Sequence, residues 1–174
     1  SKLPEKFKKE PDVILADARY FSMFRYKWIA GSAQSSLNDP YEVVLTSEKA
    51  KKYFPNLQYN QMLGKQITYQ DSLRTTVTGI VESITENTDL SFADFISYST
   101  GKIDKQLKDQ LFDAWRATSS GSQLFVKLSP NMSPSKFEAQ INGLLKKYNP
   151  PTPETKGNTQ SFHLQPLSDI HFNE

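Results

Sequence analysis

The chain has 174 residues, of which 37% are hydrophobic and 12% aromatic, so it can build one domain with a packed core and is not expected to be disordered. Its 21 basic and 19 acidic residues leave a net charge of +2, which is too balanced to predict nucleic-acid binding. It contains no cysteine, which excludes disulfides, thiolate metal sites and a cysteine nucleophile.

Short strands and a helix are predicted in the first part of the chain. Val13–Ala16 is an apolar strand candidate, and Asp17 is a suitable N-cap for a helix over Arg19–Phe24. Tyr26–Ala30 alternates and predicts a second strand, which a loop of small residues at Gly31–Ser36 follows.

A buried strand and a helix are predicted next. Tyr41–Leu45 is apolar and β-branched, Thr46 is placed to cap a helix that begins at Ser47, and Glu48 lies in its favourable first turn. The helix presents an apolar stripe of Ala50, Tyr53 and Phe54.

A β-hairpin is expected at Gln66–Tyr69 and Arg74–Val81, with Gly79 marking a bulge or a close backbone approach. Phe92, Phe95 and Ile96 form an apolar patch that we expect in a core. A four-residue recurrence of apolar side chains then predicts an amphipathic helix at Asp104–Arg116.

The last third predicts a strand-helix-strand unit over Gln123–Gln165. Gln123–Leu128 alternates as a strand, and Ser133 with Pro134 is a strong helix start. Prolines after Asn149 end that helix, and Phe162 and Leu164 alternate in a final strand. The predicted fold class is therefore α+β, with mixed sheets, a strand-helix-strand (porter-like) lobe and a smaller β-rich lobe.

No residue pattern indicates catalysis, a metal site or a cofactor site. His163 and His171 lack metal-ligand spacing, and the serines near Gly31 and at 119–122 do not form a nucleophile elbow. Gly64-Lys65 lacks the upstream glycine of a phosphate loop. The acid pairs Asp12 with Asp17 and Asp89 with Asp94 are weak candidates for glycosidase carboxylates, because sequence spacing does not fix their separation in space.

Several segments in order resemble the MacB-like periplasmic core domain of FtsX-like ABC transporter permeases. Residues 16–24 (ADARYFSMF) are similar to the family pattern A-D-x-x-F-F-x-M-F, and residues 164–172 (LQPLSDIHF) to L-x-P-L-T-D-I-H-F. Further matches lie at 31–54, which contains PYEVVLT, and at 64–65, 76–81 and 87–95. Pro55 departs from the usual glycine, and the chain begins too late to hold the strand-helix-strand unit that usually comes first.

The resemblance implies a single extracytoplasmic domain over residues 1–174. If this domain is divided into two lobes, the β-rich lobe is expected to span about residues 31–118. No apolar run approaches the roughly 18 residues that span a bilayer, and no signal peptide opens the chain, so the flanking transmembrane helices are expected to be absent from this chain. The resemblance places the domain in the periplasm, as part of an inner-membrane efflux or transport protein.

The implied function is to transmit conformational change from ATP-driven membrane helices to substrate export or to a periplasmic partner. The implied partners are the membrane, a cytoplasmic ATPase subunit or domain and a periplasmic adaptor, and no nucleic acid is expected to bind. The domain is also expected to have no enzymatic activity. Two alternatives remain open from the residues. One is a freestanding secreted or periplasmic ligand-binding module with a groove over Tyr20–Trp28, although core packing explains these aromatic residues better, and the other is a hydrolase.

Overall fold

The computed structural model describes residues 12–70, 72–84, 92–111, 123–150, 152 and 160–169. The chain divides into two compact units, Ser1–Trp115 (unit 1) and Arg116–Glu174 (unit 2), and each is described by itself. The expectation of a single domain over 1–174 therefore stays a prediction.

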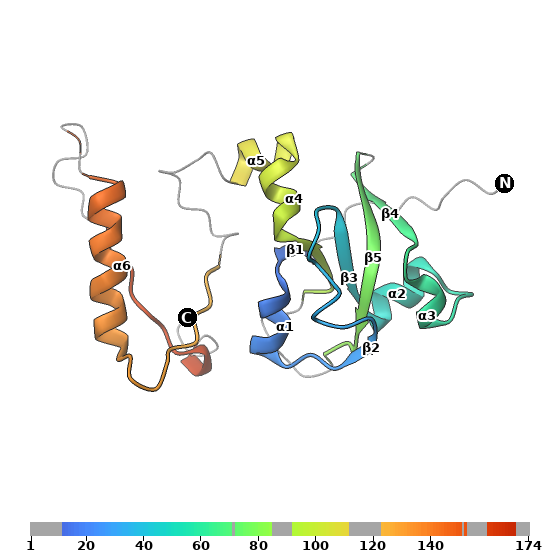
Figure 1. Cartoon of the computed structure of the whole chain (residues 1–174), viewed down its shortest axis with the longest axis horizontal. Coiled ribbons are helices and arrows are strands. Elements are labelled where there is room, and N and C mark those ends of the chain that lie inside the picture. Colours follow the sequence, from blue (N-terminus) through green and yellow to red (C-terminus); the bar gives the residue numbers. More distant parts are fainter. Residues whose placement is uncertain are drawn as a thin grey trace. The chain divides into compact units, whose positions relative to one another are not determined.

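Unit 1 is built on a mixed six-stranded sheet (Figure 1). The strand order is β1-β6-β3-β5-β2, and β4 pairs with the same long strand, β5. The strands are β1 (Val13–Ala16), β2 (Trp28–Ala30), β3 (Glu42–Thr46), β4 (Gln66–Tyr69), β5 (Leu73–Val81) and β6 (Asp94–Ser97). The predicted α+β class is confirmed, and the sheet includes two strands that precede residue 31.

The central strand β3 pairs in parallel with β5 and antiparallel with β6. The register between β3 and β5 shifts after Val43, because Val43 lies opposite Val77 whereas Val44 lies opposite Gly79. The predicted irregularity at Gly79 is thus present, and it leaves one extra residue, Thr78, on β5. A Cβ atom at Gly79 would lie 2.4 Å from the Trp28 ring, which explains why this position has no side chain.

The sheet carries one buried cluster on each face. Val43 and Leu45 belong to the first cluster, whereas Val44 belongs to the second, as expected for side chains that alternate across a strand. All three are completely buried. An apolar strand covered on both faces matches the continuous apolar run in its sequence.

Unit 1 also contains short helices, of which α5 packs on α4: α1 (Ala18–Phe24), α2 (Ser47–Tyr53), α3 (Tyr59–Met62), α4 (Tyr98–Ile103) and α5 (Lys105–Leu111). Asp17 caps α1 as predicted, since its carboxylate accepts from the Arg19 amide at 2.9 Å. Thr46 is the N-cap of α2, but its side chain makes no cap hydrogen bond, so that part of the prediction is wrong. The hydroxyl of Ser83 accepts from the Glu48 amide instead, at 3.0 Å.

Unit 2 contains the predicted long helix, α6 (Pro134–Tyr148), and a short 3-10 helix, η2 (Leu167–Asp169). The expected strands on either side are wrong, because residues 123–129 and 160–166 are not paired as strands. Alternating side chains alone do not make a strand, which also requires backbone bonds to a neighbouring strand. Here the amides of Phe162 and Leu164 donate to side chains of α6.

Candidate functional site

The aromatic residues that formed the candidate groove pack against each other in unit 1. Phe21 and Tyr26 are 2% and 8% exposed, and their rings also contact Phe95 of β6 with centroids 4.9 and 5.5 Å apart. Tyr20, Phe24 and Trp28 are partly buried and pack on the same cluster. The core-packing interpretation is confirmed, and this cluster offers no open groove.

Burial also sets the protonation of the two tyrosines in this cluster. Removal from water raises the pKa of both Tyr20 and Tyr26 above the ordinary value of 10.0. Both phenols therefore stay protonated at neutral pH, and neither is activated as a base or a nucleophile.

Asp94 is the most deeply buried acidic residue that the structure describes, at 0% exposure. Its Oδ2 atom accepts from the Tyr53 hydroxyl at 2.5 Å and from the Tyr69 hydroxyl at 2.9 Å. Burial, followed by the charge of Asp94, raises the pKa of Tyr69, so Tyr69 remains a hydrogen-bond donor. The sequence did not predict this group, because its three members come from α2, β4 and β6.

The Asp94 group joins elements that are distant in the sheet. Strand β4 pairs with β5, β5 with β3, and β3 with β6, yet Tyr69 of β4 reaches Asp94 of β6. A buried carboxyl that accepts two phenol hydrogen bonds is a suitable structural tie. Its burial gives it no approach for a substrate.

The suggested acid pairs are not brought together as catalytic carboxylates. Asp17 caps α1 and bonds the Arg19 side chain at 2.6 Å, whereas Asp12 lies 3.9 Å from the Lys49 ammonium. Asp94 binds tyrosines, and Asp89 lies outside the described residues.

The histidine and glycine candidates also have local roles. His163 is exposed and its Nε2 lies 2.9 Å from the Ser161 hydroxyl, while His171 lies outside the described residues. The Gly64 amide donates to the Val77 carbonyl at 2.8 Å, so this segment is bonded to β5 rather than forming a phosphate loop. The Ser32 hydroxyl pairs with that of Ser35 at 2.9 Å, and residues 119–122 lie outside the described part.

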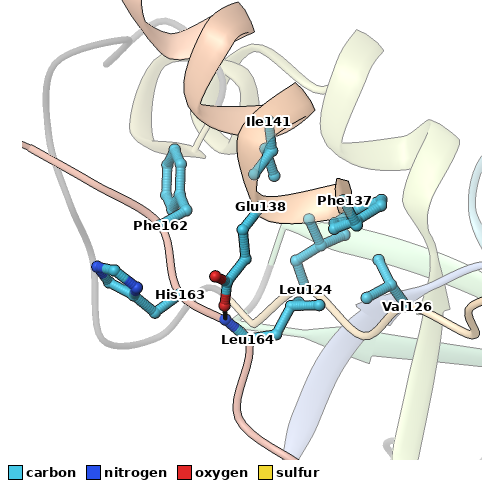
Figure 2. Close-up of a pocket in the computed structure, with 8 residues that line it drawn as sticks. All are labelled: Leu124, Val126, Phe137, Glu138, Ile141, Phe162, His163 and Leu164. Atoms are coloured by element: carbon cyan, nitrogen blue, oxygen red, sulfur yellow. Dashed lines mark hydrogen bonds between the residues drawn. The ribbon is translucent and has the colours of Figure 1, made fainter. Parts of the chain in front are cut away.

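Unit 2 contains a small apolar pocket of about 90 Å³ beside α6 (Figure 2). Figure 2 shows side chains of the helix facing those of two extended segments, with Glu138 bonded to the Leu164 amide. The lining residues are Leu124, Val126, Phe137, Glu138, Ile141, Phe162, His163 and Leu164. Glu138 and His163 supply the polar groups of this otherwise apolar lining.

Among the residues that the structure describes, no group of three or more histidine, aspartate or glutamate side chains is arranged to hold a metal ion. In the same part of the chain, no helix has the length and apolarity that crossing a membrane requires. The residues that the structure describes form an α+β fold, and the buried Asp94 among them ties packed elements together.

The comparisons with known proteins agree with that class. Residues 4–144 match the family model of the MacB-like periplasmic core domain, and the chain belongs to this family. The resemblance inferred from the sequence is therefore confirmed. No curated protein matches the chain.

One solved structure shares the fold. A crystal structure of a domain described as a permease protein from Porphyromonas gingivalis superimposes with a TM-score of 0.52 at 17% identity, covering 79% of this chain and 59% of that one. The periplasmic region of MacB from Actinobacillus actinomycetemcomitans gives a TM-score of 0.48 at 23% identity, covering 75% and 53%. The chain thus spans somewhat more than half the length of each.

Proposed function

We propose that this chain is the extracytoplasmic domain of an ABC transporter permease in the periplasm, and that it has no catalytic site. Membrane helices outside the 174 residues connect it to a cytoplasmic ATPase subunit or domain. The domain passes their movement to substrate export or to a periplasmic partner such as an adaptor. The family match over residues 4–144 is the observation that carries this proposal.

The packing of unit 1 supports a mechanical role. A domain that passes on a movement has to resist deformation itself, and close-packed interiors do so. Strand β3 is buried on both faces, and the Asp94 group ties α2 and β4 to β6. These contacts favour unit 1 moving as one body.

The location can be tested with a single thiol. Because the chain has no cysteine, Lys105→Cys on the exposed surface of α5 provides a unique reactive site within this segment. A membrane-impermeant maleimide should label it in the full-length protein when only the outer membrane is permeabilised. Labelling that requires disruption of the inner membrane would contradict the periplasmic location.

The coupling can be tested on the same variant after reconstitution of the full-length transporter with its ATPase. An environment-sensitive fluorophore on Lys105→Cys should change its emission when ATP is added on the cytoplasmic side. The control is an ATPase that binds but does not hydrolyse ATP, which should hold the signal in one state. An emission that is identical in all nucleotide states, together with transport that survives deletion of the domain, would refute the proposal.

A further inference from the structure

Helix α6 holds an extended segment through main-chain groups. The Asn142 side chain accepts from the Phe162 amide at 2.7 Å and donates to the Phe162 carbonyl at 2.9 Å. One turn away, the Glu138 carboxylate accepts from the Leu164 amide at 2.7 Å. The side-chain amide of Asn142 also donates to the backbone carbonyl of Glu138 at 2.9 Å, which fixes the orientation of the Asn142 side chain.

These bonds reproduce the pattern of a β-strand edge. A neighbouring strand would bond the N–H and C=O of one residue and the next bonding groups two residues further on. Asn142 and Glu138 are four residues apart on α6 and so lie on one face of the helix. Because the bonded groups belong to the backbone, this recognition accepts any extended chain except one with proline at these positions.

The apolar pocket adds a side-chain preference. Phe162 and Leu164 line it together with Phe137 and Ile141 of α6 (Figure 2). The fit is shallow, since Phe162 remains 48% exposed and a volume of about 90 Å³ stays open. A chain with aromatic and aliphatic residues two positions apart, seated more deeply, would fill this volume better.

We propose that the face of α6 bearing Glu138 and Asn142 is a docking site for an extended peptide strand of the pattern aromatic-x-aliphatic, and that residues 161–164 occupy it in cis. A partner strand of the same pattern binds by displacing this segment, so the cis contact is autoinhibitory. The pattern of the partner follows from the segment that is seated there. This inference concerns unit 2 itself and does not depend on the transport role.

The clamp is tested by amide hydrogen exchange measured residue by residue on the 174-residue chain. The Phe162 and Leu164 amides should be protected, and Asn142→Ala should speed exchange at Phe162 about tenfold while leaving unit 1 unchanged. Asn131→Ala, at an exposed turn, is the matched control and should change neither amide. Unprotected Phe162 in the native chain, or protection that survives Asn142→Ala, would overturn the clamp.

The docking site is tested by fluorescence anisotropy with a labelled synthetic peptide of residues 159–167. Phe162→Ser weakens the cis segment, so this variant should bind the peptide at least tenfold more tightly than the unaltered chain, as expected for loss of an intramolecular competitor. Adding Asn142→Ala should abolish binding. Equal binding of a scrambled peptide, or no saturable binding, would overturn the proposal. If Phe162→Ser unfolds unit 2, the same titration on Leu164→Ser, which removes the other apolar side chain of the cis segment, decides in its place.

Discussion

Gly79→Ala should strongly destabilise unit 1, because the new methyl group has no room. Its Cβ would lie 2.4 Å from the Trp28 ring, 2.8 Å from the Ser36 hydroxyl and 3.2 Å from a Val44 methyl group. Contacts below 3.0 Å require movement of a neighbour. Trp28 packs against Phe21 with ring centroids 5.1 Å apart, and Val44 is completely buried, so neither can move cheaply.

The size of the effect follows from overpacking in a close-packed core. One inserted methyl group typically costs about 1–3 kcal/mol, and two short contacts at once place Gly79→Ala at the upper end, near 3 kcal/mol. Gly64 provides a contrast within unit 1. Its φ is +77° but its Cβ would meet no atom within 4 Å, so Gly64→Ala carries only the backbone strain of about 1–2 kcal/mol.

The assay is urea unfolding followed by tryptophan fluorescence, with the free energy obtained by linear extrapolation. Gly79→Ala should lower the midpoint more than Gly64→Ala. Gly143→Ala in α6, with open space around it, should raise helix stability by about 0.5–1 kcal/mol, which is followed by far-UV circular dichroism because both tryptophans lie in unit 1. A loss below about 0.5 kcal/mol for Gly79→Ala would show that the bulge relaxes freely and that the packing argument is wrong.

Three further predictions concern polar groups. Tyr69→Phe removes one of the two phenol donors to Asp94 and should cost about 1–3 kcal/mol in urea unfolding. The control is Tyr26→Phe, whose hydroxyl has no hydrogen-bond partner among the described residues, and it should cost less than about 0.5 kcal/mol. Equal losses would contradict the stabilising role of the Tyr69–Asp94 hydrogen bond. Alkaline pH should destabilise unit 1, because the raised pKa of buried tyrosines keeps them protonated when folded while the unfolded chain ionises near 10.0. The contribution of these tyrosines to the free energy of unfolding is complete below about pH 10. Above that pH it is lost by up to about 1.4 kcal/mol per pH unit for each tyrosine. A urea midpoint that is the same at pH 11 as at pH 9 would refute this prediction. Asp17→Ala should cost about 1 kcal/mol by removing the α1 cap and Asp17→Asn much less, which thermal unfolding can measure; similar losses would assign the effect to charge instead.

The elements that the sequence predicted well are those whose signals are local. Strand β3 and helix α2 were placed within about one residue, because an apolar run and a change to helical spacing meet at Thr46. The hairpin of β4 and β5 and the start of α6 at Ser133 were equally local. The functional class was predicted from the segments that resemble the family's sequence patterns, because helix and strand patterns carry no information about function.

The errors and omissions come from contacts that are distant in sequence. Strand β6 was missed as a strand because two of its four residues, Asp94 and Ser97, are polar yet buried. The two tyrosines that bond Asp94 lie 25 or more residues away, and the Ser97 hydroxyl bonds the distant Leu37 carbonyl as well as the nearby Ser99. Segment 123–128 has the alternation of a strand but no strand to pair with among the described residues. The clamp on α6 was likewise hidden, because Asn142 in a helix has the same sequence appearance whether it faces water or another segment.

The pairing of β1 with β6 has a consequence for how the protein is made. Val13 is hydrogen-bonded into the sheet beside Asp94, so during synthesis the strand Val13–Ala16 has to wait for the strand Asp94–Ser97. About eighty intervening residues must be available before that edge closes, and such distant pairings slow folding. Until then an apolar tetrapeptide with open backbone groups is available to other chains. A holding chaperone is therefore expected to act on the nascent segment Val13–Ala16 rather than on the folded sheet.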